Sequence, residues 1–231
     1  MSPLSQIEEQ GHAPEWLFDA AVDEKANYAR LTKGLAAEPG DRSRRAQSQI
    51  LIAAWQLFGS LGYAAVTIEE IARRAQVSRP AVYSYFYSKR SIFLALAVAV
   101  NSRYQRKVRS FAQISEVRNL EAGVGPWVTD YVQFLEETHW FTLMWDNVVG
   151  EDRPLREEGV RQQQLAWSTF GSHLAELGGG HGTDHSLIDG MIVLPMLERV
   201  WFYWSLADGP VSRTALESEL TSVIIAIARR S

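Results

Sequence analysis

Residues 67–89, with the sequence TIEEIARRAQVSRPAVYSYFYSK, constrain the fold more than any other part of the chain. Thr67 can accept a backbone N–H as the N-cap of a helix, and apolar residues follow it at helical spacing. Ser78 is placed to cap a second helix, and Pro80 stands in the first turn of that helix, where its missing N–H costs nothing. Two short helices joined by such a turn form a helix-turn-helix, whose second helix can lie in the major groove of DNA. The segment therefore predicts a DNA-binding unit.

A longer helix is expected just before this unit. Apolar side chains over residues 50–61 recur on one face of a helix. Gly62 is well placed to end that helix in the left-handed conformation. A third helix thus completes a small DNA-binding domain.

The same residues resemble the tetracycline-repressor (TetR) family of transcriptional regulators. The shared features, in the family's order, are the LFGSLGY end of the first helix, Thr67, the Val-Ser turn, Tyr83, the Tyr85-Phe86 pair and Lys89. The resemblance covers residues 42 to about 111 and becomes weaker beyond. It implies an all-α fold, with an N-terminal three-helix DNA-binding domain followed by a larger helical ligand-binding and dimerisation domain. The expected domains are a partly helical N-terminal extension (1–41), the helix-turn-helix domain (42–88) and the ligand-binding and dimerisation domain (89–231).

Charge is distributed unevenly along the chain. Residues 42–110 carry 12 Lys and Arg against 2 Asp and Glu, whereas residues 1–41 have a net charge of −5 and residues 111–231 a net charge of −9. A basic block bounded by acidic ones is typical of a nucleic-acid-binding domain joined to one that avoids nucleic acid.

Composition excludes several other classes of protein. The chain has no cysteine, so disulfides and thiol-based redox sensing are excluded. The longest apolar tract, residues 188–206, contains charged residues and a proline, so it predicts a buried helix and not a membrane span. The first residues do not combine a charged segment with an apolar core, so we expect no secretory signal. We expect a cytoplasmic protein without a cofactor.

Helices are expected throughout the second half. One long helix should run from Lys89 to about Phe111 and connect the two domains. A break is expected over residues 123–126, followed by one helix over 127–139 and a separate short one over 141–149. Later helices are expected over 156–177, 183–207 and 212–230. The N-terminal extension has helical character, and either a helix packed on the protein body or a mobile arm fits it.

The resemblance assigns DNA contacts to particular residues. Tyr83, Tyr85 and Lys89 are expected on phosphates, as is Thr67 through the start of its helix. Ser78, at the start of the recognition helix, belongs to the same surface. Candidates for base edges are Arg79, Ser84 and Pro80. Three arginines could reach a minor groove from the end of the extension, namely Arg42, Arg44 and Arg45. Phe86 is expected in the core, and Tyr83 can be half core with only its hydroxyl exposed.

The second domain is rich in aromatic residues, which indicates a binding site for an apolar effector. The candidate pocket residues are Trp127, Tyr131, His139, Trp145, Trp167, Phe170 and Trp201. Plain core packing is the alternative for each of them. His181, Asp184 and His185 lack a fourth ligand, so no metal site is expected.

A homodimer is expected through the last two helices, as the family resemblance implies. The candidate interface residues are Met191, Leu220, Val223, Ile224 and Ile227. The predicted function is a dimeric transcriptional regulator, most simply a repressor, that a small apolar or aromatic molecule releases from a near-palindromic operator. An enzyme is disfavoured because the chain has no phosphate-binding Gly loop, nucleophile elbow or HExxH motif. An architectural DNA-binding protein with a completely filled second domain remains the other alternative.

Overall fold

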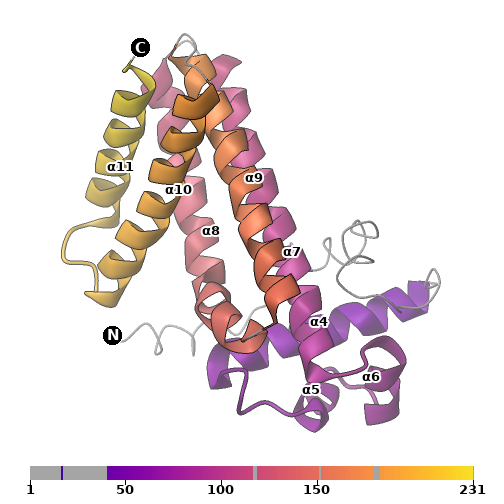
Figure 1. Ribbon diagram of the computed structural model, residues 1–231. Helices are drawn as coiled ribbons and strands as arrows, with labels where there is room; N and C mark the ends of the chain where they lie inside the picture. The colour runs from indigo at the N-terminus through magenta and orange to yellow at the C-terminus, as the bar shows by residue number, and fades with distance from the viewer. Residues whose placement is uncertain (1–16, 18–40, 117–118, 151, 179–182, 231) are drawn as a thin grey trace. The chain divides into compact units, whose positions relative to one another are not determined.

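The computed structural model describes Leu17 and residues 41–116, 119–150, 152–178 and 183–230. All regular secondary structure in these ranges is helical, which confirms the expected all-α class (Figure 1). The helices are, in order, α4 (Asp41–Leu61), α5 (Ile68–Arg74), α6 (Arg79–Tyr85), α7 (Lys89–Ser110), the 3₁₀ helix η1 (Phe111–Glu116), α8 (Leu120–Val149), α9 (Arg153–Leu177), α10 (Thr183–Leu206) and α11 (Arg213–Ala228). None of these helices is both long and apolar enough to cross a bilayer. Apart from Leu17, the expected N-terminal extension lies outside the described residues.

Local capping sets the start of both helices of the helix-turn-helix. The Thr67 hydroxyl accepts the backbone N–H of Glu70 at 3.2 Å, and the Glu70 carboxylate accepts the Thr67 N–H at 2.7 Å. This reciprocal pair is a capping box. The Ser78 hydroxyl accepts the N–H of Ala81 at 3.2 Å, and a proline occupies the first turn of α6. Both N-caps expected from the sequence are thereby confirmed.

The chain divides into two compact units. Of the described residues, the first unit holds 41–103 and 140–150, and the second holds 104–139 and everything from 152 onward. The limit expected at residue 88 falls inside the first unit, because α7 starts at Lys89 and buries Ile92 and Phe93 completely. Both α7 and α8 contribute residues to each unit.

The last turns of α8 form part of the core of the first unit. Trp140 meets Trp55 of α4 edge to face, with ring centroids 4.4 Å apart. Phe141 stacks on Phe93 of α7 at 4.5 Å. Aromatic pairs of this kind contribute about 0.5–1.5 kcal/mol beyond their buried area. Aromatic contacts therefore connect the C-terminal end of α8 to two other helices of the first unit.

Helix α8 is continuous, which corrects the breaks expected over residues 123–126 and near residue 140. Pro126 lies in the second turn, so it removes only one intrahelical hydrogen bond. The Gly123 N–H donates to the Asn119 carbonyl at 3.2 Å, and Gly123 packs closely against the Ile114 side chain. Burial of Trp127 and its apolar neighbours along the same face holds the helix together despite these weak helix formers.

Two glycines allow α9 and α10 to approach closely in the second unit. A Cβ at Gly190 would lie 2.0 Å from the Trp167 carbonyl oxygen, and one at Gly171 would overlap the Ser186 carbonyl oxygen. No larger residue fits either position without moving a backbone. Helix α11 adds Leu220, which is buried together with its apolar neighbours along the helix.

Candidate nucleic-acid interface and effector site

Recognition helix α6 presents one polar face and one buried face. Val82 and Phe86 are fully buried, so Phe86 occupies the core as expected. Arg79, Pro80, Tyr83 and Ser84 are exposed and line one shallow hollow on the protein surface. The structure thus brings the three residues expected at base edges together with Tyr83. Tyr85 is only half-buried, and Ser78 uses its hydroxyl to cap the helix.

Arg79 is held by neighbours on both short helices. One guanidinium nitrogen lies 2.7 Å from the Glu69 carboxylate of α5. The other lies 3.5 Å from the Tyr83 hydroxyl, and the guanidinium carbon is 5.6 Å from the centroid of the Tyr83 ring. Glu69 thus stays largely exposed to solvent while its carboxylate pairs with an arginine of the recognition helix.

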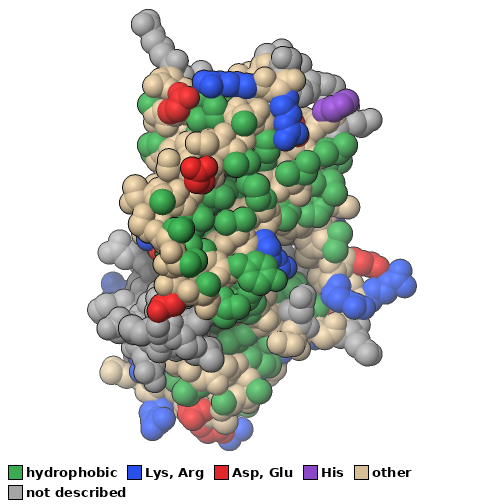
Figure 2. Space-filling view, turned by 90° about the vertical axis from the view of Figure 1, so that its left-hand side faces the viewer, with side chains coloured by type: hydrophobic (Ala, Val, Ile, Leu, Met, Phe, Trp, Pro, Cys, Tyr) green, Lys and Arg blue, Asp and Glu red, His purple; other side chains and the backbone are tan. Residues whose placement is uncertain are grey.

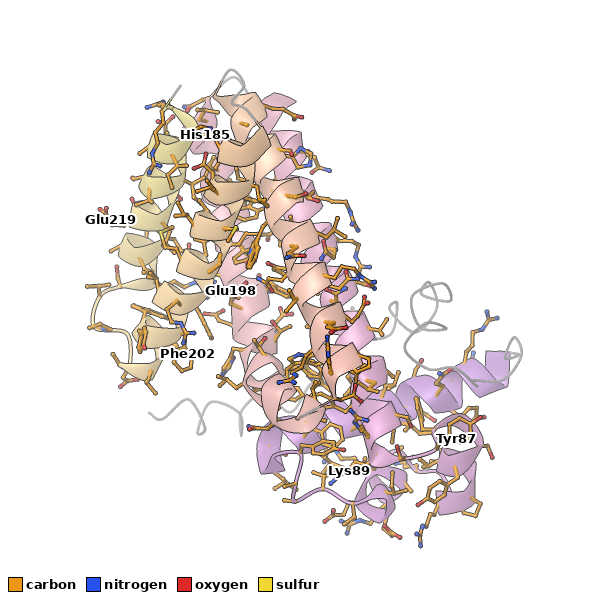
Figure 3. The ribbon with its side chains drawn as sticks, in the orientation of Figure 1. Tyr87, Lys89, His185, Glu198, Phe202 and Glu219 are labelled. Atoms are coloured by element: carbon orange, nitrogen blue, oxygen red, sulfur yellow. The ribbon has the colours of Figure 1, made fainter. Side chains whose placement is uncertain are left out.

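Lys89, which is labelled in Figure 3, forms hydrogen bonds with backbone carbonyls of its own chain. Its ammonium donates to the carbonyls of Tyr63 at 2.8 Å and Val66 at 2.7 Å, and lies 4.4 Å from the centroid of the Tyr63 ring. Burial lowers the pKa of Lys89, with Glu70 acting in the opposite direction. Lys89 therefore secures the turn between α4 and α5, and a phosphate would have to share an ammonium that these carbonyls already engage.

The start of α5 already holds an anion of the chain itself. Hydrogen bonds from the Thr67 backbone N–H and hydroxyl lower the pKa of the Glu70 carboxyl. A phosphate at Thr67 would compete with this carboxylate for the same donors. The phosphate contacts of Thr67 and Lys89 stay predictions, and the structure gives both residues a stabilising role.

The three N-terminal arginines lie within the first turns of α4 and not on an extended arm. Arg44 and Arg45 are exposed, and the side chain of Arg42 lies outside the described residues. The alternative of a mobile arm concerned residues 1–41, which apart from Leu17 and Asp41 lie outside the described residues, and the minor-groove contact of the three arginines stays a prediction. Tyr87, which the sequence left unassigned, is 68% exposed just beyond α6.

Five of the seven candidate pocket residues form two groups in the second unit, one of three residues and one of two. Trp127 and Phe170 have ring centroids 5.4 Å apart, and Trp127 also stacks on Tyr131 at 5.0 Å. His139 and Trp201 form the second group, at 5.0 Å. Burial lowers the pKa of His139, which favours a neutral imidazole.

The structure separates Trp145 from the other candidates. Trp145 belongs to the first unit and stacks on Phe93 at 6.4 Å, so a place for it in the effector pocket stays a prediction that the division into units does not support. Its assignment to the pocket rested on its aromatic character alone. Because α8 is continuous, Trp145 follows Trp127 along the helix by about five turns. Trp167 is half-buried, and its backbone packs against Gly190.

A partly buried polar cluster joins residues of four helices in the second unit. The Tyr131 hydroxyl of α8 donates to the Glu198 carboxylate of α10 at 3.2 Å, and Gln163 of α9 donates to the hydroxyl of Tyr104 of α7 at 3.5 Å. Burial raises the pKa of Glu198 to about 7, against smaller opposing effects of Tyr131, Tyr104 and Arg199. The sequence offered one signal for this residue, a carboxylate within the longest apolar tract of the chain.

Some buried polar atoms of this unit have no hydrogen-bond partner among the described residues. They are the indole nitrogens of Trp167 and Trp201 and the amide oxygen of Gln105. Trp201 is only 3% exposed and Gln105 only 5%. Buried donors and acceptors are normally paired, so these atoms mark places where a bound molecule could supply the missing group.

The expected dimer interface is only partly exposed. Met191 and Val223 are exposed, whereas Leu220, Ile224 and Ile227 are buried within the single chain. The latter three belong to the protomer's own core, which corrects their assignment to the interface. Helix α10 instead exposes further apolar side chains, namely Leu187, Ile188, Ile192, Val200, Tyr203 and Leu206. Figure 2 shows hydrophobic side chains gathered over the side of the molecule that carries α10 and α11 in Figure 1.

Comparisons with known proteins agree with this geometry. The family described as "Bacterial regulatory proteins, tetR family" matches residues 50–96. The HTH-type transcriptional activator FasR of Mycolicibacterium smegmatis is 45% identical over 58 residues, which span 25% of each of the two chains. The similarity to FasR is thus confined to a quarter of either protein.

Two solved structures share the fold over most of the chain. A TetR-family regulator from Mesorhizobium loti has 21% identity and a TM-score of 0.67, covering 81% of this chain and 97% of that one. The regulator FadR of Bacillus subtilis, solved in complex with stearoyl-CoA, has 14% identity and a TM-score of 0.57, covering 77% and 97%. Residues 50–96 therefore match the DNA-binding segment of the tetR family, and the chain shares its helical fold with TetR-family regulators of solved structure.

Proposed function

We propose that the protein is a homodimeric repressor that releases its operator when an apolar or aromatic molecule binds in the second unit. The observation that carries this proposal is that α7 and α8 each belong to both compact units. A ligand that shifts either helix in the second unit acts on a helix that is also part of the DNA-binding core. Such a ligand changes DNA affinity only as far as it prefers one arrangement of these helices.

Operator recognition is assigned to the exposed face of α6. Arg79 supplies the donors for a guanine, and the ring of Pro80 suits contact with a thymine methyl. Tyr83 and Tyr85 are assigned to phosphates, which set the register of the protein without reading sequence. The basic charge of residues 42–110 supports this assignment.

Dimerisation is assigned to the exposed apolar face of α10 with Val223 of α11. Exposed apolar patches of this extent commonly mark protein–protein interfaces. A two-fold axis between two copies requires a near-palindromic operator, with half-sites about one helical turn or a multiple of it apart. Met191, which is 45% exposed, is the interface residue to test.

The effector is assigned to the aromatic interior of the second unit, around Trp127, Tyr131, Phe170 and Trp201. Their apolar surfaces suit an apolar molecule, and the unpaired indole N–H of Trp201 suits an acceptor atom on it. The stearoyl-CoA bound by the Bacillus subtilis FadR, a protein of the same fold, supports an effector with a long apolar chain.

Coupling to DNA is assigned to the end of α8 as well as to α7. Trp140 and Phe141 contact Trp55 and Phe93, which lie on two helices of the DNA-binding unit. Coupling of this kind is typically worth about 1–3 kcal/mol. A saturating effector should therefore weaken operator binding about 5- to 150-fold.

The test begins with selection of bound DNA from a random pool, which gives the operator and its half-site spacing. Operator affinity is then measured with stearoyl-CoA and, as a control, with coenzyme A alone. Trp201→Phe keeps an aromatic ring and removes the unpaired N–H, so it should weaken binding of the acyl compound and leave operator affinity unchanged. Trp145→Phe, in the first unit, is the matched control. Binding of stearoyl-CoA without any change in operator affinity would contradict the regulatory mechanism.

Dimerisation is tested separately by sedimentation. Met191→Glu places an unpaired charge in the proposed interface and should yield a monomer with weakened operator binding. Val160→Glu changes an exposed apolar residue of α9 and should leave the dimer intact. If the Met191→Glu protein were still a dimer, the interface would have to lie elsewhere on the surface. Repression itself is checked by transcription from a reporter that carries the selected operator.

A further inference from the structure

An acidic side chain stands on the surface that is assigned to DNA. Glu69 lies in the first turn of α5 and its carboxylate reaches across to Arg79, the first residue of α6, at 2.7 Å. Glu70, its neighbour, completes the capping box with Thr67, so helix capping does not require Glu69. The two carboxylates are the only acidic groups in residues 42–110.

Stability does not explain why Glu69 is paired with Arg79. Both side chains are more than half exposed, at 57% for Arg79 and 56% for Glu69. Exposed ion pairs contribute little to folding, because solvent and salt screen them. A carboxylate near the DNA backbone also opposes binding, since it repels phosphates. The pair therefore has a cost for DNA affinity and little benefit for the fold.

The contacts of Arg79 restrict the direction of its guanidinium. Glu69 holds one terminal nitrogen, while the Tyr83 hydroxyl lies 3.5 Å from the other. An arginine reads guanine by donating two parallel hydrogen bonds, which requires the guanidinium plane to have one particular orientation. An unrestrained arginine at this position can instead turn toward a phosphate, which carries no sequence information.

We propose that Glu69 is a specificity-determining residue that positions Arg79 to read a guanine in the operator. It acts through Arg79, by orienting the guanidinium and by repelling any phosphate that would otherwise draw the arginine away from the base. The inference rests on the proposed base-reading role of Arg79. Its consequence is that Glu69 lowers affinity for DNA in general and raises discrimination between operator and random DNA.

The test compares the affinities of variants for the selected operator and for random DNA of equal length. Glu69→Gln should strengthen binding to random DNA, because a negative charge is gone, and lower the ratio of operator to random affinity at least fivefold. The bound sequences selected by this variant should lose their preference at one base pair of each half-site. Glu70→Gln is the matched control, because it removes the same charge one residue away while glutamine can still complete the capping box. It should strengthen binding to both DNAs by one common factor.

Two further variants separate the failure of this inference from the failure of the proposed function. Arg79→Ala should lower the affinity ratio, and adding Glu69→Gln to it should lower the ratio no further, because both residues act on one contact. An equal gain in affinity for both DNAs in Glu69→Gln would overturn the positioning role while Arg79 keeps its own. A ratio that Arg79→Ala leaves unchanged would overturn both. Thermal unfolding of each variant shows that folding is retained.

Discussion

Replacing Glu198 with glutamine should remove a pH-dependent loss of stability. In the folded protein burial raises the pKa of this carboxyl to about 7 from the ordinary 4.5. Below pH 4.5 the carboxyl is neutral in both the folded and the unfolded chain. Between pH 4.5 and 7 the unfolded chain releases this proton while the folded protein retains it, so this group makes the folded protein less stable as the pH rises.

The pKa difference sets the size of the effect. Each pH unit between the two pKa values corresponds to about 1.4 kcal/mol, so the wild-type protein should lose about 3 kcal/mol between pH 4.5 and 8 through Glu198. Glutamine keeps an oxygen that can accept the Tyr131 hydroxyl and has no charge to bury. The Glu198→Gln protein should therefore gain stability relative to the wild type as the pH rises.

The assay is urea unfolding followed by tryptophan fluorescence at several pH values between 5 and 8. Protomer concentration must be held constant, because dimerisation contributes to the apparent stability. The quantity of interest is the difference in unfolding free energy between variant and wild type, from which the other titrating groups cancel. Glu219→Gln, which changes an exposed glutamate of α11, should parallel the wild type at every pH (Figure 3). If the difference in unfolding free energy between the Glu198→Gln protein and the wild type did not change between pH 5 and 8, the raised pKa of Glu198 would be refuted.

Three other substitutions test contacts described above. Lys89→Met should destabilise the protein by about 1–3 kcal/mol in thermal unfolding, because backbone carbonyls lose a charged donor. The slope of log DNA affinity against log salt concentration should be the same in this variant as in the wild type if Lys89 contacts no phosphate. If Lys89 does contact a phosphate, the slope should become shallower by about one unit. Gly190→Ala should lower the melting temperature, since its Cβ would collide with the Trp167 carbonyl; an unchanged value would contradict the close crossing of α9 and α10. Thr67→Ala should cost about 1 kcal/mol through loss of the cap, and unfolding free energies equal to those of the wild type would argue against it.

The helix-turn-helix could be predicted from the sequence because its helix caps and apolar spacing involve residues that are close together in the chain. The caps at Thr67 and Ser78 depend on residues three positions away, and Phe86 is buried as its apolar character predicts. Spacing and capping are properties of neighbouring residues, so the sequence displays them directly. The exposed face of α6 follows from the same periodicity.

The partners of long side chains were decided by tertiary structure. Arg79 pairs with Glu69 across a turn, and Lys89 donates to carbonyls more than twenty residues earlier in the chain. Neither contact has a sequence signature, because the distance between two helices depends on how they pack. The break expected at the weak helix formers Gly123 and Pro126 is absent for a related reason, since burial of one face of α8 outweighs their local preference.

The sequence by itself determined which residues form helices and which face of each helix is apolar. It did not determine what covers an apolar face. The stripe along α11 was expected to meet a second subunit, but Ile224 is fully buried within its own chain, while Met191 of α10 is exposed. Periodicity reports that a face avoids water, and burial in a core or against a partner satisfies that requirement equally, so only the packing of the whole chain distinguishes them.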